Sequence, residues 1–109
     1  MDNLVKEAYY RLLFAIFGER FPETEVDMSQ IDDLSKQITA VLDTIWEERA
    51  ELIKLRFGIS DGIPKTISEI AKVLDVGEFE TKQIEIEAMK QLRHPSRTGV
   101  LRPFLPEED

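Results

Sequence analysis

Apolar side chains recur at helical spacing along most of this chain, and no strand-like alternation persists. Spacings of three and four residues place such side chains on one face of a helix. The first stripe consists of Leu4, Ala8, Leu12, Leu13, Ile16 and Phe17. We expect Gly18 to end that helix and Ser29 to cap a second one. The second stripe consists of Ile31, Leu34, Ile38, Val41 and Leu42. A third helix is predicted from Trp46 to Phe57, with Gly58 ending it, so the pattern predicts an all-α protein.

The segment TISEIAKVLDVGEFETKQIEIEAMKQLRHP indicates two helices joined by a tight turn. Thr66 and Glu69 fit a capping box, which would start a short helix through Leu74. A longer helix is expected to follow the turn DVGE, from about Glu78 to Arg93. A short helix, a tight turn and a longer helix make a helix-turn-helix.

Composition narrows the possible functions. The 109 residues carry a net charge of −8, with an excess of acids in residues 1–40 and 106–109 and near neutrality between them. A nearly neutral middle with local basic patches can still contact phosphate. The chain has no cysteine, which suits a cytoplasmic protein, and no apolar run long enough to cross a bilayer. We find no nucleophile elbow, no glycine-rich phosphate loop and no His–carboxylate metal spacing, so we expect no enzyme, no cofactor and no metal.

Residues 41–105 resemble region 4 of the housekeeping, sigma-70-type bacterial sigma factors. The resemblance rests on LDTI, LRFGISDGIPKT, EIAKVLDV, QIE, LRHPSR and VLRPFL, which follow the family pattern in order. It implies a helix-turn-helix domain of four to five helices, without a wing, to which an N-terminal helix is added. Residues 1–40 have no recognised family and residues 106–109 form an acidic tail. Because the chain opens with Met1, we expect a freestanding region 4 protein.

In such sigma factors, region 4 reads the −35 promoter element with the second helix of the motif. The resemblance also implies binding to the β flap of core RNA polymerase. The DNA-binding candidates that it implies are Lys82, Gln83, Lys90, Arg93 and Arg97. Alternatively, Lys90 and Arg93 only stabilise their helix by lying at the negative end of its dipole. His94 then has a structural role or is merely exposed. Arg56 is a candidate for polymerase binding, for contact with the DNA backbone, or for a solvated face.

The predicted recognition helix departs from the family pattern. Glu78 and Glu80 stand where basic residues are usual, and Glu87 replaces a usual lysine. From residue 78 to residue 91 there are four glutamates and two lysines, which weakens attraction to phosphate. The inner stripe of this helix is predicted to consist of Thr81, Ile84, Ala88 and Leu92. Phe79 and Ile86 lie on the outer stripe with Gln83 and Lys90. Apolar side chains on this stripe indicate contact with a protein partner or with residues 1–40 folded back over the helix. Alternatively, they pack in the ordinary way against a neighbouring helix.

The N-terminal helix carries aromatic residues beside its aliphatic stripe and must be covered. It could pack on the domain, form a homodimer, or bind polymerase or another sigma factor. We expect Trp46 to pack against residues 1–40. Two functions remain open. One is a transcription-initiation protein that binds polymerase and contacts −35 DNA weakly. The other is a module or decoy that binds polymerase, a sigma partner or an anti-sigma factor without DNA.

Overall fold

The computed structural model describes residues 2–22 and 26–106, and these residues form helices and connecting turns with no strand. The elements are α1 (Asn3–Ile16), α2 (Ile31–Leu42), α3 (Glu47–Phe57), α4 (Ile67–Leu74), α5 (Glu78–Leu92), α6 (Pro95–Thr98) and the 3₁₀ turn η1 (Arg102–Phe104). The all-α prediction is confirmed. Within the described residues, no helix is both long and apolar enough to span a membrane.

The ends of α1 and α2 follow local rules, with one difference from the prediction. Asp2 caps α1 by accepting the Val5 N–H, and Gly18 follows the helix with φ 72°. The prediction that Ser29 caps α2 is wrong, because the N-cap is Gln30 and makes no side-chain bond. Ser29 instead donates its backbone N–H to Asp27 Oδ1 at 2.9 Å. This bond is the main reason that the pKa of Asp27 is lowered.

Helix α3 ends at Gly58, where the neighbouring backbone leaves no room for a side chain. Gly58 adopts the left-handed conformation, with φ 75° and ψ 32°. A Cβ at this position would lie 2.8 Å from the backbone N and C of Ile63. The following loop therefore folds back tightly against the end of α3. The predicted helix end at Gly58 is confirmed.

Helices α4 and α5 form the predicted helix-turn-helix. Thr66 accepts the Glu69 N–H, and Glu69 accepts the Thr66 N–H, each at 3.1 Å. The capping box is thus confirmed, and its hydrogen bond from the Thr66 N–H is the largest cause of a lowered pKa for Glu69. Asp75 turns the chain with φ 56°, a left-handed conformation that aspartate tolerates. The buried Thr81 hydroxyl donates to Gly77 O at 2.8 Å, so it leaves no unpaired donor in the core.

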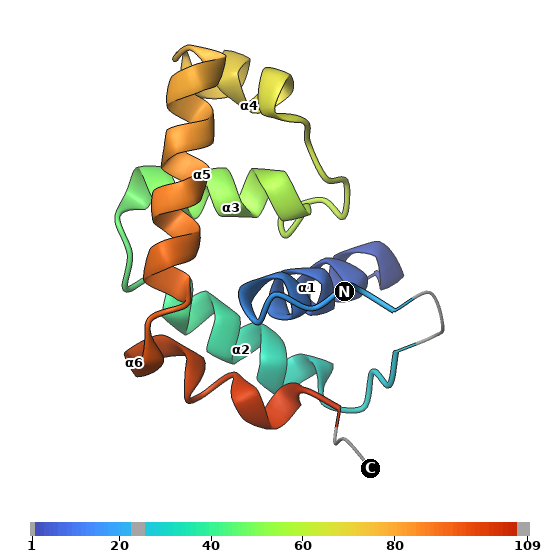
Figure 1. Cartoon of the computed structure of the whole chain (residues 1–109). Helices are drawn as coiled ribbons and strands as arrows, with labels where there is room; N and C mark the ends of the chain where they lie inside the picture. The colour runs from blue at the N-terminus through green and yellow to red at the C-terminus, as the bar shows by residue number, and fades with distance from the viewer. Residues whose placement is uncertain (1, 23–25, 107–109) are drawn as a thin grey trace.

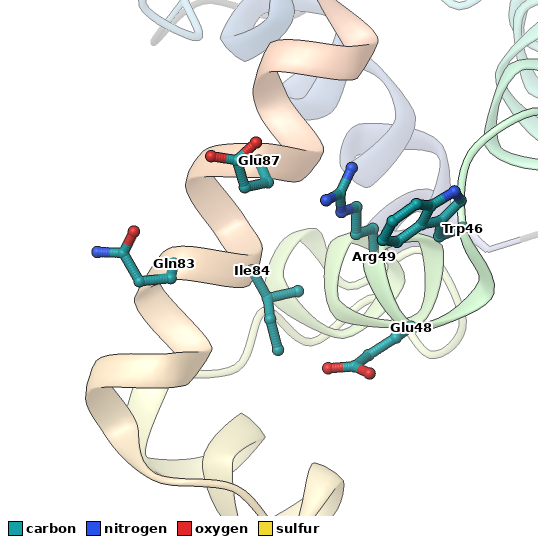
Figure 2. Close-up of a pocket in the computed structure, with 6 residues that line it drawn as sticks. All are labelled: Trp46, Glu48, Arg49, Gln83, Ile84 and Glu87. Atoms are coloured by element: carbon teal, nitrogen blue, oxygen red, sulfur yellow. The ribbon is translucent and has the colours of Figure 1, made fainter.

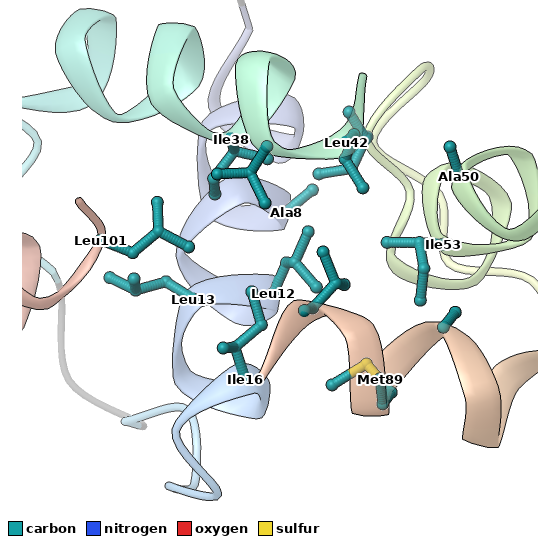
Figure 3. Packing of buried hydrophobic residues seen from close by; sticks show 14 of the residues in the cluster. Ala8, Leu12, Leu13, Ile16, Ile38, Leu42, Ala50, Ile53, Met89 and Leu101 are labelled. Atoms are coloured by element: carbon teal, nitrogen blue, oxygen red, sulfur yellow. The ribbon is translucent and has the colours of Figure 1, made fainter. Parts of the chain in front are cut away.

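The core lies where α1 meets α2, α3 and the C-terminal half of α5 (Figures 1 and 3). Leu12 and Leu13 of α1 are 1% and 0% exposed. Leu42 and Ile53 approach α1 from α2 and α3, while Leu101 approaches it from the segment after α6 (Figure 3). Helix α4 lies at the other end of α5, away from α1 (Figure 1). The N-terminal helix is therefore part of the main core, whereas the helix-turn-helix projects from it.

Two glycines allow the clash at Gly58 to be tested. Both Gly18 and Gly58 have positive φ, but a Cβ at Gly18 would meet no atom within 4 Å. Gly18→Ala should cost about 1 kcal/mol, from the left-handed backbone alone. Gly58→Ala should cost at least about 1 kcal/mol more, because the loop must move. Urea unfolding of both variants measures the difference, and equal losses of stability would contradict this account of the loop.

Candidate nucleic-acid and protein interface

The outer face of α5 carries the predicted contact residues. Lys82, Gln83 and Lys90 are exposed. Phe79 and Ile86 are 74% and 46% exposed, so this helix presents two large apolar side chains to solvent. The opposite face consists of the buried Thr81, Ala88, Met89 and Leu92 and the half-buried Ile84. The predicted division of α5 into an inner and an outer stripe is confirmed. The described part of residues 1–40 does not cover Phe79.

Charge on the outer face of α5 is mixed. Glu78 and Glu80 are exposed in the first turn of the helix. There they face the positive end of the helix dipole, which stabilises α5. Lys90 forms an ion pair with Glu87 at 3.5 Å, one turn of helix away. The N-terminal half, which would enter a DNA groove in this motif, thus presents two carboxylates beside Lys82.

Arg93 lies at the end of α5 and binds the end of another helix. Its Nε donates to Ile16 O at 3.1 Å and its Nη2 to Ala15 O at 3.0 Å. These carbonyls belong to the last turn of α1, which contains no basic residue of its own. Arg93 therefore satisfies Ile16 O, adds a second donor to Ala15 O, which also accepts the Gly18 N–H, and places a cation at the negative end of the α1 dipole. No spacing in the sequence indicates this contact, because the partners are 77 and 78 residues apart.

Arg97 and His94 also have partners within the chain. Arg97 Nε donates to Thr44 Oγ1 at 2.9 Å, and its Nη1 donates to Gln91 O at 3.2 Å. These bonds link α6 to the turn after α2 and to the end of α5. His94 Nδ1 accepts the Ser96 N–H at 3.2 Å and caps α6. Arg93, His94 and Arg97 therefore all make hydrogen bonds to other groups within the chain.

Arg56 connects three segments in the middle of the molecule. Its Nε donates to Glu85 Oε2 at 2.8 Å, and its Nη1 donates to Lys65 O at 2.9 Å. The two side chains of the ion pair are 37% and 27% exposed. Arg56 thus joins α3 both to α5 and to the loop that enters α4. These contacts help to hold the helix-turn-helix against α3.

A shallow groove lies beside the outer face of α5 (Figure 2). It has a volume of about 220 Å³ and is lined by Trp46, Glu48, Arg49, Gln83, Ile84 and Glu87. The expectation that Trp46 packs against residues 1–40 is wrong, because Trp46 is 69% exposed. The guanidinium carbon of Arg49 lies 4.3 Å from the centre of the Trp46 ring. The spacing of three residues at a helix start could have indicated this contact.

The described part of the chain contains no group of three or more histidine, aspartate or glutamate side chains that could hold a metal ion. The interface residues instead offer hydrogen-bond donors, charges and apolar surface. They are suited to binding a macromolecule.

The two glutamates in the middle of α5 should differ in their effect on stability. Glu85→Gln removes the half-buried partner of Arg56 and should cost about 1 kcal/mol of unfolding free energy. Glu87→Gln removes a more exposed ion pair and should change stability by less than about 0.5 kcal/mol. Both variants lose one charge from the same helix, so thermal or urea unfolding isolates the contact with Arg56. Equal effects would show that this contact does not hold α5.

Comparison with known proteins agrees with this geometry. Residues 41–94 match the family described as Sigma-70, region 4. The RNA polymerase sigma factor SigA of a Bacillus species is 40% identical over 82 residues, which are 75% of this chain. The match spans 22% of the length of that relative. The matched region begins near the end of α2 and includes α3, α4 and α5. The family match and the all-helical fold together identify the chain as a sigma-70 region 4-like protein.

Proposed function

We propose that this protein acts in transcription initiation by binding the β flap of core RNA polymerase and contacting −35 promoter DNA weakly. The observation that carries the proposal is the exposed outer face of α5, the second helix of a region 4 helix-turn-helix. Lys82 and Gln83 are exposed on this face. Lysine can contact phosphate, and glutamine can read adenine with two hydrogen bonds. The protein would need no cofactor and would catalyse no reaction.

The weakness of the DNA contact follows from the charges. Glu78 and Glu80 stand exposed at the end of α5 that would lie deepest in the groove. Of the five DNA-binding candidates, Arg93 and Arg97 already donate to backbone carbonyls within the chain. Few cations are left to release counterions from DNA, and that release supplies much of DNA affinity. DNA contact would then depend on tethering by polymerase, which raises the effective concentration of the weak site.

Polymerase binding is inferred from the family and from the similarity to an RNA polymerase sigma factor. Arg56 is a weak candidate for this contact, because its guanidinium is bound to the Glu85 side chain and to Lys65 O. A second polypeptide could supply the regions that recognise the −10 element. The protein would then contribute only the upstream half of promoter recognition.

Reversing the two carboxylates tests whether α5 docks in a DNA groove. Glu78→Arg together with Glu80→Arg should raise affinity about tenfold or more for each new phosphate contact at low salt. Fluorescence anisotropy with a duplex carrying a −35 consensus, and with a scrambled duplex, measures the effect at two salt concentrations. Asp32→Arg together with Asp33→Arg is the matched control, because it makes the same charge change in the exposed first turn of α2.

A gain confined to the α5 variant supports the docking of this helix in the groove. An equal gain in both variants would mean that only net charge matters. No gain in either variant would argue against a DNA-facing α5. Thermal unfolding should accompany the titration, because arginine in the first turn of α5 is unfavourable to the helix dipole.

The second candidate function is a protein-interaction module that does not bind DNA. The exposure of Phe79 favours it, because a phenylalanine that is 74% exposed on a DNA-facing helix gains nothing from phosphate. Phe79→Ala should weaken a complex with polymerase, a sigma partner or an anti-sigma factor about tenfold or more if this ring is an anchor. Ile63→Ala, at an exposed apolar residue in the loop before α4, is the control. Unchanged binding of core polymerase by Phe79→Ala would remove polymerase from these candidates.

A further inference from the structure

The outer stripe of α5 has the spacing of a seam between two packed helices. Phe79, Gln83, Ile86 and Lys90 follow one another at intervals of four, three and four residues. These intervals are those of a coiled coil, with Phe79 and Ile86 at d positions and Gln83 and Lys90 at a positions. All four side chains are exposed, so no described segment of the chain covers the seam.

The two edges of this seam carry opposite charges. On a helix of 3.6 residues per turn, Lys82 lies about 70° to one side of the seam and Glu87 about 70° to the other. They therefore occupy the g and e positions that flank a coiled-coil seam. Lys82 is exposed and forms no ion pair with the described residues. The Glu87 side chain is 45% exposed, and its long pair with Lys90 leaves it open to another cation.

The edge that carries Glu87 also borders the groove of Figure 2. The lining includes the carboxylates of Glu48 and Glu87 and the apolar groups of Trp46 and Ile84. The one cation of the lining, Arg49, lies over the Trp46 ring. Two carboxylates beside apolar walls suit a lysine, which has an apolar stem and a cationic head. The opposite edge of the same helix supplies such a side chain in Lys82, so the surface is complementary to itself.

We propose that α5 pairs with the α5 of a second copy of this chain, parallel and in register, about a two-fold axis. In a parallel pair, each g position meets the e position five residues further along the partner helix. Lys82 then meets the partner's Glu87 at the rim of the groove, and the symmetry repeats this contact on the other side. An antiparallel pair would place Lys82 against the partner's Lys82, so the charges select the parallel arrangement.

The residues within the seam make the dimer specific but weak. Phe79 and Ile86 each meet their own copy and withdraw apolar surface from water. Gln83 also meets its copy, and an amide group can both donate and accept a hydrogen bond in such a pair. Lys90 meets its copy unfavourably, although Glu87 offsets part of this charge. A seam of about three helical turns buries little area, so the two copies exchange readily.

The dimer covers the face through which we propose that the protein contacts DNA. Lys82 and Gln83 cannot contact a second α5 and a DNA groove at the same time. Self-association would therefore withhold this face from DNA, and DNA would dissociate the dimer. This consequence rests on the proposed function, whereas the pairing itself does not.

Two charge-swapped variants test the pairing. Lys82→Glu and Glu87→Lys each give both edges of the seam the same charge, so each variant alone should dimerise at least about tenfold more weakly than the wild-type chain. An equimolar mixture of the two should recover the dimer, because the edges of the two variants are complementary at both contacts. Sedimentation equilibrium of the complete chains, at up to about 1 mM protein, measures all of these affinities.

Lys36→Glu and Asp33→Lys are the matched controls. They make the same charge changes at exposed positions of α2, and each should dimerise as the wild-type chain does. The proposal is overturned if the wild-type chain stays monomeric over the whole range, or if the mixture of α5 variants associates no more than each variant alone. Equal loss and recovery in the α2 variants would also overturn it, because net charge would then be the cause.

Adding a duplex that carries a −35 consensus separates this inference from the proposed function. If the duplex binds and converts dimers into DNA-bound monomers, both stand. If the duplex does not bind while the charge-swapped mixture still recovers the dimer, the proposed DNA contact fails and the pairing stands. Binding of the duplex to an intact dimer would overturn the claim that both use the same face of α5.

Discussion

The inner face of α5 determines where the other helices lie. Near its start, the buried Thr81 is fixed to the helix N-cap, and α4 packs against this half. In its middle, Glu85 holds Arg56 of α3. At its end, Leu92 enters the main core and Arg93 binds the end of α1. Because one helix makes all of these contacts, α5 sets the position of α4 relative to the main core.

This arrangement divides the basic residues into two kinds. Arg56, Arg93 and Arg97 each donate to carbonyl oxygens of other segments, and their planar guanidinium groups are suited to several such bonds at once. Lys82 and Lys90 stay on the surface, where a lysine loses little by being solvated. These arginines therefore link segments of the domain, and the two lysines are the candidates left for the proposed contact with phosphate. The chain has 14 lysines and arginines against 22 aspartates and glutamates, so its net charge of −8 gives no general attraction to phosphate.

Local rules made most of the helical structure predictable. The capping box at Thr66, the helix end at Gly58 and the two stripes of α5 depend on residues within one or two turns, and all agree with the structure. Contacts between distant segments were not predictable in this way. Arg93 reaches α1 only because the fold brings the two helix ends together, and no spacing in the sequence encodes that distance. Trp46 was misplaced because a large ring usually lies in a core, whereas here it lies against Arg49 at the surface. The proposed partners rest on family membership, which the helical pattern alone would not have supplied.

Trp46 also gives the protein a built-in optical reporter. It is the only tryptophan in the chain, so all indole emission comes from one place. That place is the groove between the start of α3 and the outer face of α5, where Gln83 and Glu87 also lie. The ring is largely open to water, and its emission must respond when water is displaced or when Arg49 moves away. Events on the face of α5 can therefore be followed in the unlabelled protein.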